Sequence, residues 1–532
     1  MGLFGKWSRR DLLKSSGAVA GVAAAPAAAM AAAPAAKDMP KDMVIHTGTM
    51  EKNLFTEVGV RPILNARGTY TIISGSRSLP QVKQAMFEAG HYYVQMDEMM
   101  EGVGKELARL NGCESAMATN GCESAIILAT IACIAGSNIE KCQALPYIKG
   151  KDQVIIPKHS RNPYDVGVRV VGAEVVEVET PDQLRAKISG RTAMIYVASD
   201  PQEARSVLPI AAIIAIAKEK NIPVFVDAAA EEPMSPNVYM QQGASFVGYS
   251  GGKCLRAPQS SGMLLGKADL IKAAWFQASP HHNYARALKC SKEETMGLLA
   301  AVRQWYKRDH DGEQRMWRSW MQSVEARLKP IKGLAFEYLE PQGLSNRATR
   351  LRIKWDATEV GITGNELEKR LNDGSPRIMV EPTTGHRPDM MASSVTLMPY
   401  MMDAGDEKVL ANALFKIFSN PGHYENPPMP TGAPASVGGT WAVTIQYTCG
   451  MGEQHFTLKQ DGNSLTGDHK GEIYKASLKG TVRGDQVKLQ SAMPVGGNAI
   501  RWTFEGSVRG NSMSGNVNMG EYGPATFTAV RA

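Results

Sequence analysis

The sequence has few cysteines and gives them no pattern. There are seven in 532 residues, an odd number, and they are spread along the chain instead of grouped. This excludes the dense disulfide framework of small secreted domains and supplies no set of closely spaced thiols for zinc. We therefore expect no metal site, and we expect most of the cysteines to be small apolar residues of the interior.

Long hydrophobic runs and concentrated basic tracts are also missing after residue 36. A membrane-spanning helix needs about 20 apolar residues, and no such run occurs there. The whole sequence carries a net charge of +7, but its first 36 residues hold four basic residues and one acidic residue, so the rest carries about +4. We therefore expect no stable membrane anchor and no nucleic-acid partner.

The first 36 residues have the composition of an export signal. Two adjacent arginines, Arg9 and Arg10, precede a mildly apolar stretch of Ala, Gly and Val, and the end offers several A-x-A sites between Ala29 and Ala36. This order resembles a twin-arginine signal peptide. We expect residues 1–36 to be that signal, so that the twin-arginine export machinery carries the protein to the periplasm of a Gram-negative cell. The alternative is a basic helix start beside low-complexity Ala/Pro sequence.

The central stretch of the chain runs from an apolar strand into two glycines and a lysine, as Phe246-Val-Gly-Tyr-Ser250-Gly-Gly-Lys253. A lysine that follows a strand on glycine-rich backbone can reach into a cleft, because no bulky neighbour blocks its stem. A lysine amine that is partly removed from water forms a Schiff base readily. The alternative is an exposed lysine in a turn.

A second strand, Val224-Phe-Val-Asp227, is apolar throughout and ends in an aspartate. Such a run is typical of a parallel strand covered on both faces, and its carboxyl end lies where open α/β sheets bind ligands. Pyridoxal phosphate (PLP) requires a lysine for covalent attachment and a carboxylate beside its pyridine nitrogen. Lys253 and Asp227 together therefore predict a PLP site, in preference to a helix N-cap role for Asp227.

A glycine turn at Asn120-Gly121-Cys122 opens an apolar stretch, Ile126–Ala135, that we expect to be helical. Free N–H groups and the positive end of a helix dipole suit a phosphate at such a turn. We expect Asn120, Gly121 and Cys122 to contact the cofactor phosphate. Without Lys253, an ordinary strand–turn–helix joint would be the better interpretation.

Between residues 152 and 280, short apolar runs alternate with helical patterns, such as the helix expected over Ile210–Glu219. This βα alternation predicts a mostly parallel, doubly wound sheet. We place a polar arm at 37–59, a large domain at 60–330 and a smaller α+β domain at 331–420. The strands expected in the large sheet are Val154–Ile156, Val175–Val178, Ala193–Val197, Val224–Val226, Phe246–Gly248 and Met263–Leu265.

A stretch rich in Pro and Gly, 421–439, precedes a segment of different pattern. From 440 to 532 apolar and polar residues alternate, and glycine-centred turns recur at Gly462, Gly484 and Gly510. Alternation with such turns is typical of β-hairpins. We expect 421–439 to be a linker and 440–532 to be a small antiparallel sheet or barrel without a catalytic site.

The motifs occur in an order and spacing similar to those of a known family. They are Arg61-Pro-Ile-Leu-Asn65-Ala-Arg67-Gly-Thr-Tyr-Thr71, Asn120-Gly121-Cys122-Glu-Ser-Ala125, Phe225-Val-Asp227-Ala-Ala, Gly251-Gly-Lys253 with Pro258-Gln259, and Arg286-Ala-Leu-Lys289-Cys-Ser-Lys292-Glu293. From about residue 60 to 420 the chain resembles the selenocysteine synthase family of fold type I PLP enzymes, whose relatives often carry the label L-seryl-tRNA(Sec) selenium transferase. The resemblance implies a PLP-dependent transferase fold and a homodimer or larger homo-oligomer.

The resemblance also implies roles for individual residues. Lys253 would form the Schiff base and Asp227 would pair with the pyridine nitrogen. Ser250 would offer a hydroxyl to the phosphate, and His159 would stack on the ring. The alternative for His159 is a solvated loop histidine.

The implied chemistry is α-proton abstraction from a small amino acid or amino sugar acid, with β-elimination favoured by family analogy. Arg377 and Arg387 are the candidates for the arginine that usually binds a substrate carboxylate. Racemisation and tRNA-dependent selenium transfer are alternatives within the family, and a catalytically silent envelope binding protein is the alternative outside it. A signal and a short arm stand where the family's tRNA-binding domain would be, which argues against tRNA as a substrate.

Overall fold

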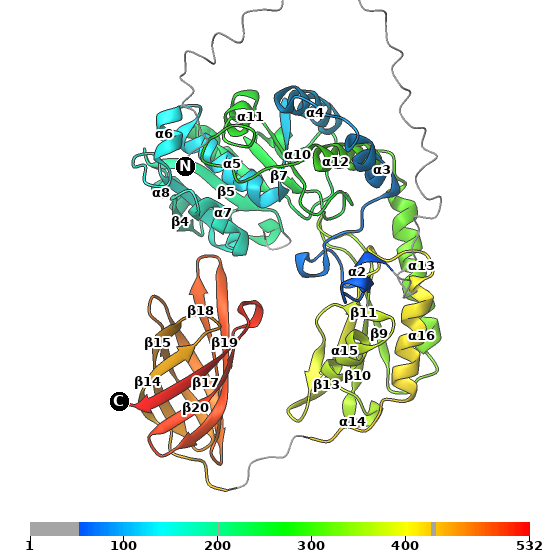
Figure 1. Ribbon diagram of the computed structural model, residues 1–532, viewed down its shortest axis with the longest axis vertical. Helices are drawn as coiled ribbons and strands as arrows, with labels where there is room; N and C mark the ends of the chain where they lie inside the picture. The colour runs from blue at the N-terminus through cyan, green and yellow to red at the C-terminus, as the bar shows by residue number, and fades with distance from the viewer. Residues whose placement is uncertain (1–52, 201–202, 427–431) are drawn as a thin grey trace, which may run out of the picture. The chain divides into compact units, whose positions relative to one another are not determined.

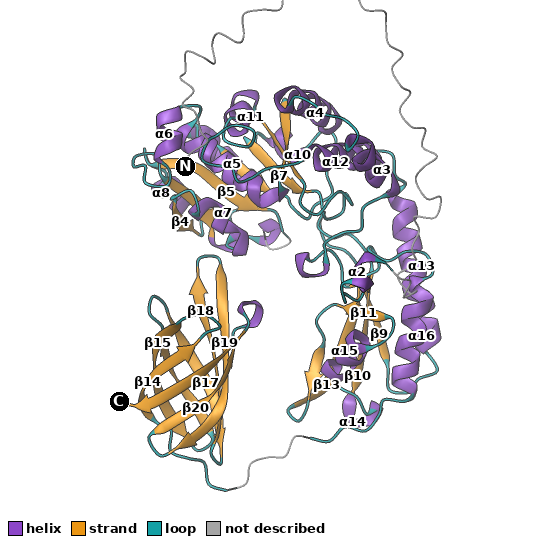
Figure 2. Cartoon of the chain, viewed as in Figure 1, coloured by secondary structure: helices purple, strands orange, loops and turns teal. Residues whose placement is uncertain are grey.

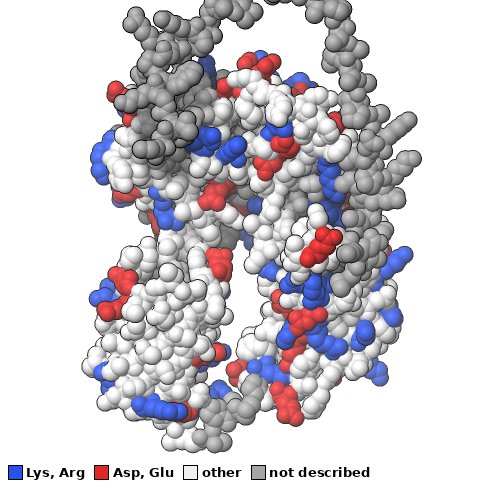
Figure 3. Space-filling view, viewed as in Figure 1, with Lys and Arg blue, Asp and Glu red and all other residues white. Residues whose placement is uncertain are grey.

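The computed structural model describes residues 53–200, 203–426 and 432–532. The twin-arginine signal expected at 1–36 lies outside the described residues, as do most of the expected arm and part of the expected linker. Among the described helices, none is both long and apolar enough to cross a membrane. Basic and acidic side chains are intermixed on the face shown in Figure 3.

The sheet of the predicted large domain, called the large sheet below, has seven strands and is mostly parallel, as predicted (Figure 1). Six strands run in one direction, and β8 is antiparallel to both of its neighbours. All six strands expected from the sequence are present. In spatial order the strands are β2 (Ser115–Thr119), β8 (Gly262–Gly266), β7 (Phe246–Ser250), β6 (Val224–Asp227), β5 (Thr192–Ala198), β3 (Gln153–Pro157) and β4 (Glu174–Val178).

The middle of this sheet is covered on both faces, because every residue of β5, β6 and β8 is buried. Helix α5 (Gly121–Ala135) packs against the central strands and buries twelve of its fifteen residues, which explains why it is apolar all round. Other helices of this part are shown in Figure 2. They are α3 (Pro80–Ala89), α4 (Met96–Asn111), α6 (Ile139–Ala144), α7 (Val166–Arg169), α8 (Pro181–Lys187), α9 (Ile210–Glu219), α10 (Val238–Gln242), α11 (Ala268–Trp275) and α12 (Lys292–Trp305).

A second, smaller core is built on a four-stranded antiparallel sheet of order β12-β13-β10-β9. Beside it, β1 and β11 form a two-stranded parallel pair that joins distant parts of the sequence. The strands are β1 (Ile63–Ala66), β9 (Ala335–Leu339), β10 (Arg350–Asp356), β11 (Arg377–Val380), β12 (Thr384–His386) and β13 (Met390–Leu397). The helices are α13 (His310–Leu328), α14 (Ala357–Val360), α15 (Gly364–Asp373) and α16 (Asp406–Ser419). Helix α2 (Leu54–Glu57) precedes β1 in the sequence and buries none of its residues.

The predicted boundary at residue 330 does not follow the packing of these two cores. Trp317, Trp320 and Met321 of α13 are buried in the smaller core, together with Leu64 of β1. Helix α13 and strand β1 therefore belong to the smaller part, although the expected boundaries assign both to the large domain. Long-range pairing of β1 with β11 is invisible to a reading based on local pattern.

The C-terminal segment is a closed eight-stranded antiparallel barrel, which confirms the predicted antiparallel β domain. Buried and exposed residues alternate along its strands, so apolar side chains fill the interior. The three expected glycine turns have positive φ, at Gly462, Gly484 and Gly510. The strands are β14 (Gly439–Gln446), β15 (Met451–Asp461), β16 (Ser464–Lys470), β17 (Lys475–Arg483), β18 (Gln486–Val495), β19 (Asn498–Arg509), β20 (Ser512–Asn518) and β21 (Pro524–Arg531).

One histidine, His469, is fully buried inside the barrel. Its Nδ1 lies 2.6 Å from Ser491 Oγ, and its Nε2 contacts Gln454 Oε1. Because an amide oxygen only accepts, Nε2 carries the proton and Nδ1 accepts from the Ser491 hydroxyl. The ring is therefore neutral, and burial lowers the pKa of His469 from 6.5 to about 4.

Acidification should lower the unfolding free energy of the barrel, because His469 must be protonated on unfolding. The unfolded chain binds a proton there near pH 6.5, whereas the folded barrel binds one only near pH 4, so stability falls as the pH drops between these values. From pH 7 to pH 5 the unfolding free energy should decrease by about 2 kcal/mol. Protection factors from hydrogen exchange of barrel peptides in the intact protein measure this. His469→Leu should remove the pH dependence, whereas replacing the exposed His455 should leave it; equal effects of both would contradict the assignment.

Candidate active site

Polar residues collect at the carboxyl edge of the large sheet. Asp227 is the last residue of β6, Ser250 is the last residue of β7, and Lys253 follows three residues later. Asp227 pairs with Gly248 in the parallel register, so the two strands end side by side. Strand β2 runs in the same direction as β7 and leads into Asn120 at this edge.

The loop that carries Lys253 is packed so closely that only glycine fits before the lysine. A Cβ on Gly251 would lie 2.2 Å from Ser261 Oγ, and one on Gly252 would lie 2.7 Å from Gln259 Cα. Lys253 itself is half-buried and lines a cavity. Within the described part of the chain its ammonium group makes no hydrogen bond or ion pair, so the amine is available to a ligand.

The carboxylate of Asp227 is buried and has a donor on each side. Its Oδ2 accepts a hydrogen bond of 2.7 Å from the hydroxyl of Tyr196. Its Oδ1 accepts from the backbone N–H of Ala229 at 3.1 Å and from the thiol of Cys122 at 3.4 Å. The Tyr196 hydroxyl in turn accepts from Asn162 Nδ2 at 3.1 Å. These contacts fix the direction in which the carboxylate points.

Both side-chain donors are kept protonated. Burial and the adjacent Asp227 carboxylate raise the pKa of Tyr196 well above its ordinary value. Burial and Asp227 likewise raise the pKa of the Cys122 thiol, and Lys253 opposes this shift in part. Cys122 is therefore within electrostatic reach of both Asp227 and Lys253, which places the three in one site.

Tyr196 also belongs to this cluster, and the sequence patterns did not predict it. It lies within the strand predicted over Ala193–Val197, and its ring stacks on Phe225 with a centroid separation of 5.9 Å. A tyrosine in an otherwise apolar buried strand needs a partner for its hydroxyl. A buried tyrosine in an apolar strand could therefore have been noticed in the sequence, but the sequence does not show that Asp227 is the partner of its hydroxyl.

The N-terminus of α5 has the features of an anion site. Gly121 has φ +77°, and nothing lies within 4 Å of the position of a Cβ on its outer side. The side chain of Asn120 does not cap the helix but donates to the carbonyl of Lys289 at 3.0 Å. On the sheet side a Cβ on Gly262 would lie 2.6 Å from the Gly121 carbonyl carbon, so glycine lets this turn sit tightly on β8. The first N–H groups of α5 are thus open to a phosphate.

His159 and Ser250 lie at the same edge. His159 follows β3 and is half-buried; its Nε2 is 3.3 Å from the carbonyl of Leu208, and its Nδ1 is 3.2 Å from Ser160 Oγ. The carbonyl only accepts, so Nε2 donates and Nδ1 accepts. These bonds orient the ring, and stacking on a cofactor stays a prediction. Ser250 is half-buried, and its contact with a phosphate is likewise a prediction.

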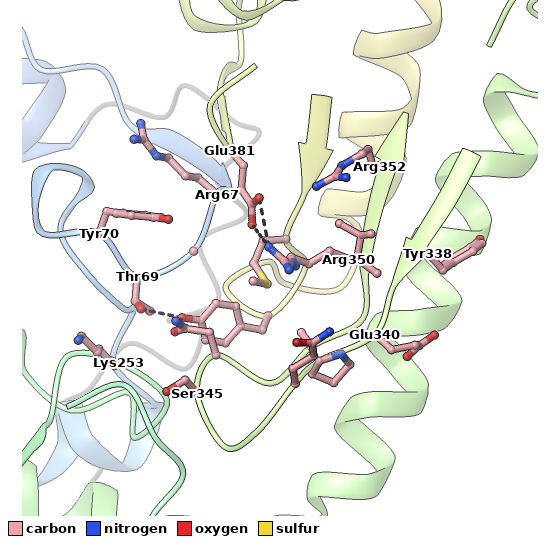
Figure 4. Close-up of a pocket in the computed structure, with 18 of the residues that line it drawn as sticks. Arg67, Thr69, Tyr70, Lys253, Tyr338, Glu340, Ser345, Arg350, Arg352 and Glu381 are labelled. Atoms are coloured by element: carbon pink, nitrogen blue, oxygen red, sulfur yellow. Dashed lines mark hydrogen bonds and ion pairs between the residues drawn. The ribbon is translucent and has the colours of Figure 1, made fainter. Parts of the chain in front are cut away.

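A cavity of about 750 Å³ opens in front of Lys253 and is lined mainly by residues of the smaller core. Figure 4 shows Arg67, Thr69 and Tyr70 on one side and Tyr338, Glu340 and Arg352 on the other. The wall between them is hydrogen-bonded: the Thr69 and Tyr400 hydroxyls are 2.6 Å apart, and Tyr400 donates to Asn346 at 2.9 Å. This wall is polar and suits a hydroxylated ligand.

The structure does not bring Arg377 and Arg387 to this cavity. Arg387 forms an ion pair with Glu366 at 2.9 Å, and Arg377 donates to Asn372 at 2.7 Å. Neither side chain is among those that line the cavity. The arginines that line it are Arg67, Arg350 and Arg352. The sequence indicated these arginines only indirectly: Arg67 stands in the first quoted motif, and Arg350 and Arg352 alternate along strand β10.

Comparison with known proteins also points to a PLP-dependent enzyme. Residues 41–260 match the family described as Cys/Met metabolism PLP-dependent enzyme. The D-glucosaminate-6-phosphate ammonia lyase of Salmonella typhimurium (strain 14028s / SGSC 2262) is 28% identical over 336 residues, which is 61% of this chain and 88% of that protein. A solved structure of a D-glucosaminate-6-phosphate ammonia-lyase has a TM-score of 0.59 and 25% identity, and the match covers 70% of this chain and 99% of that one.

The chain is a PLP-dependent enzyme of fold type I. Two further relatives differ in activity. The 5'-C-glycyluridine monooxygenase-decarboxylase of a Streptomyces species is 29% identical over 375 residues, 68% of this chain and 90% of that protein. The L-seryl-tRNA(Sec) selenium transferase of Proteus mirabilis (strain HI4320) is 36% identical over 103 residues, 17% of this chain and 21% of that protein. The predicted resemblance to fold type I PLP enzymes, the fold and the cofactor are thereby confirmed, whereas the export signal stays a prediction.

The side chains present in the enzyme fit PLP. Lys253 supplies an amine that has no partner among the described residues, and Asp227 supplies a buried carboxylate at the end of β6, at the same edge of the sheet. The uncapped N-terminus of α5 supplies N–H groups for the phosphate. These three features come from three different strand ends, so they meet only when the sheet is formed.

Tyr196→Phe tests the support of Asp227. The variant removes one donor from the carboxylate but keeps the ring, so it should fold and retain PLP while kcat drops about 10-fold, the value of one hydrogen bond to a charged group. The cofactor's visible absorbance and a pH–rate profile are the measurements. Tyr239→Phe is the matched control, because the Tyr239 hydroxyl donates to Glu231 and not to Asp227. Equal losses in both variants would refute the role given to Tyr196.

Proposed function

We propose that this enzyme is an exported PLP-dependent lyase that deaminates a small amino acid or amino sugar acid by β-elimination. The observation that carries the proposal is the amine of Lys253, which has no partner among the described residues and opens on a roomy cavity with a polar wall, at the sheet edge where hydrogen bonds hold Asp227. The similarity to D-glucosaminate-6-phosphate ammonia lyase supports elimination as the outcome. A cavity with hydroxyl and amide groups along one wall suits a substrate that carries hydroxyl groups itself.

Each residue has a distinct task in this reaction. Bound PLP supplies an electron sink for the negative charge that develops at the substrate α-carbon. Asp227 would keep the pyridine nitrogen protonated, and the N-terminus of α5 would hold the phosphate. Lys253 would take the proton from the substrate α-carbon. The bond from the β-carbon to its leaving group then breaks, and the released enamine hydrolyses to a 2-oxo acid and ammonia.

Two other outcomes start from the same proton transfer. If the proton returns to the opposite face of the α-carbon, the result is racemisation. If an acceptor adds at the β-carbon, the result is a transfer such as that to selenium. Ammonia and a 2-oxo acid distinguish elimination from both. We do not retain the silent binding protein, because Asp227 and Lys253 both occupy positions suited to PLP chemistry.

Screening the purified enzyme against D- and L-amino acids and amino sugar acids, with ammonia and 2-oxo acid as readouts, tests the reaction. Lys253→Ala should lower turnover by at least about 1,000-fold, since it removes both covalent attachment and the base. Borohydride should fix PLP covalently to residue 253 of the parent and not of the variant, as mass spectrometry will show. Lys267→Ala, which alters an exposed lysine after β8, is the control. Fixation of PLP elsewhere would refute the assignment of Lys253.

We further propose that the enzyme works as a homodimer or larger homo-oligomer, as the family resemblance implies. Helix α2 supports this, because it buries none of its residues and leaves Leu54 79% and Phe55 65% exposed. Apolar side chains so exposed commonly mark a contact with another chain. Light scattering of the mature protein should give more than one chain's mass.

The export part of the proposal rests on the first 36 residues and on the need for a folded site. PLP belongs to the cytoplasm, and Lys253, Asp227 and the turn at Gly121 meet only in a folded chain. The enzyme should therefore load PLP before it crosses the membrane, and cofactor binding will favour the folded state. Arg9→Lys combined with Arg10→Lys keeps both charges and should leave the uncleaved, PLP-loaded protein inside the cell. Cell fractionation with an absorbance scan decides; export of the double variant, or an exported protein without PLP, would count against the proposal.

A further inference from the structure

Four basic side chains line the cavity, and two of them are already paired with acidic residues. Arg350 forms an ion pair with Glu381 at 3.3 Å. Arg352 donates to Thr396 Oγ1 at 3.4 Å and lies 3.8 Å from Glu337. Lys253 is committed to the cofactor. Arg67 is the remaining basic side chain on the cavity wall.

Arg67 has no acceptor in the described residues. Its Nε is buried and makes no hydrogen bond. Its guanidinium carbon lies 4.8 Å from the centre of the Tyr70 ring, a contact that stabilises the cation without occupying an N–H group. A buried N–H without an acceptor is unfavourable and rare in native proteins, unless a ligand supplies the acceptor.

The backbone holds Arg67 in place before any ligand arrives. Asn65 Oδ1 accepts from the N–H groups of both Arg67 and Gly68 at 2.9 Å, and Asn65 Nδ2 donates to the Gly68 carbonyl. Gly68 has φ +112°, a backbone conformation that residues with a side chain rarely adopt, so glycine is favoured there. A guanidinium on such a fixed turn is preorganised, which reduces the entropy that binding costs.

We propose that Arg67 binds the carboxylate of the substrate and selects substrates that carry one. The guanidinium fork matches a carboxylate in two parallel hydrogen bonds, and its position on the same cavity as Lys253 lets one small molecule reach both. This role replaces the one expected for Arg377 and Arg387. It deepens the proposed lyase function and rests on it for the identity of the ligand as a substrate.

A pair of reagents tests Arg67 without knowledge of the natural substrate. Aminooxyacetate and O-methylhydroxylamine both displace Lys253 from PLP through the same aminooxy nitrogen, but only the first carries a carboxylate. The rate of each displacement follows from the change in the visible absorbance of the holoenzyme. Division by the rates with free PLP in solution removes the intrinsic difference between the reagents. The corrected ratio measures how strongly the site recognises a carboxylate.

The parent enzyme should prefer aminooxyacetate by about 10- to 100-fold, as one charge-assisted contact implies. Arg67→Gln should bring the ratio to about 1, and Arg67→Lys should restore part of it. Arg377→Gln, the same substitution outside the cavity, should keep the parental ratio. PLP content and thermal unfolding of each variant establish that the site is intact.

Three results would overturn the inference: no preference in the parent, a full preference in Arg67→Gln, or a loss of preference in Arg377→Gln instead. None of them depends on ammonia release, because the reagents report on carboxylate recognition alone. If the preference follows Arg67 but no amino acid is deaminated, the lyase proposal fails and the carboxylate site remains. If ammonia is released without the preference, Arg67 fails and the lyase proposal remains.

Discussion

The parallel pairing of β6 with β7 is the constraint on which the rest of the site depends. Because the two strands run in the same direction, their last residues meet at one edge of the sheet, and Asp227 and Lys253 share a site. Tyr196 reaches the same carboxylate from β5, the other parallel neighbour of β6. An antiparallel partner would have sent one of these residues to the opposite edge.

Tight glycine contacts convert this arrangement of strands into a usable cleft. Gly251 and Gly252 let the lysine loop lie against Ser261 and Gln259, and Gly262 lets the α5 turn lie against β8. Each contact is closer than a Cβ would permit. The backbone therefore occupies the space that side chains take elsewhere, and the functional groups project from a rigid support.

Local pattern predicted a large part of this structure. The helix expected over Ile210–Glu219 has those bounds, and the strand that ends in Asp227 is present, because periodicity and burial act within one element. The residues expected at the phosphate and the pyridine nitrogen stand at one edge of the sheet, since parallel strands share it. Their contacts with the cofactor remain predictions.

The parts that the sequence did not reveal are those set by distant contacts. In the sequence Tyr196 looks like any other residue of an apolar strand, and its hydrogen bond to Asp227 of β6 exists only in the folded sheet. Arg377 and Arg387 lie in the smaller part, as expected, but Asn372 and Glu366 hold them away from the cavity. Arg67 stood in a quoted motif, yet its lack of an acceptor is a property of the folded surroundings and not of the motif.

The pairing of β1 with β11 has a consequence for how the chain folds during synthesis. Ile63 pairs with Arg377, roughly 300 residues later, while the strands of the large sheet all lie between residues 115 and 266. At ribosomal rates of about 5–20 residues per second, β1 leaves the ribosome at least about fifteen seconds before its partner strand exists. Leu64 and Ala66, which end in the smaller core, are exposed during that interval. Strand β1 therefore reaches its native pairing only after all strands of the large sheet have been synthesised.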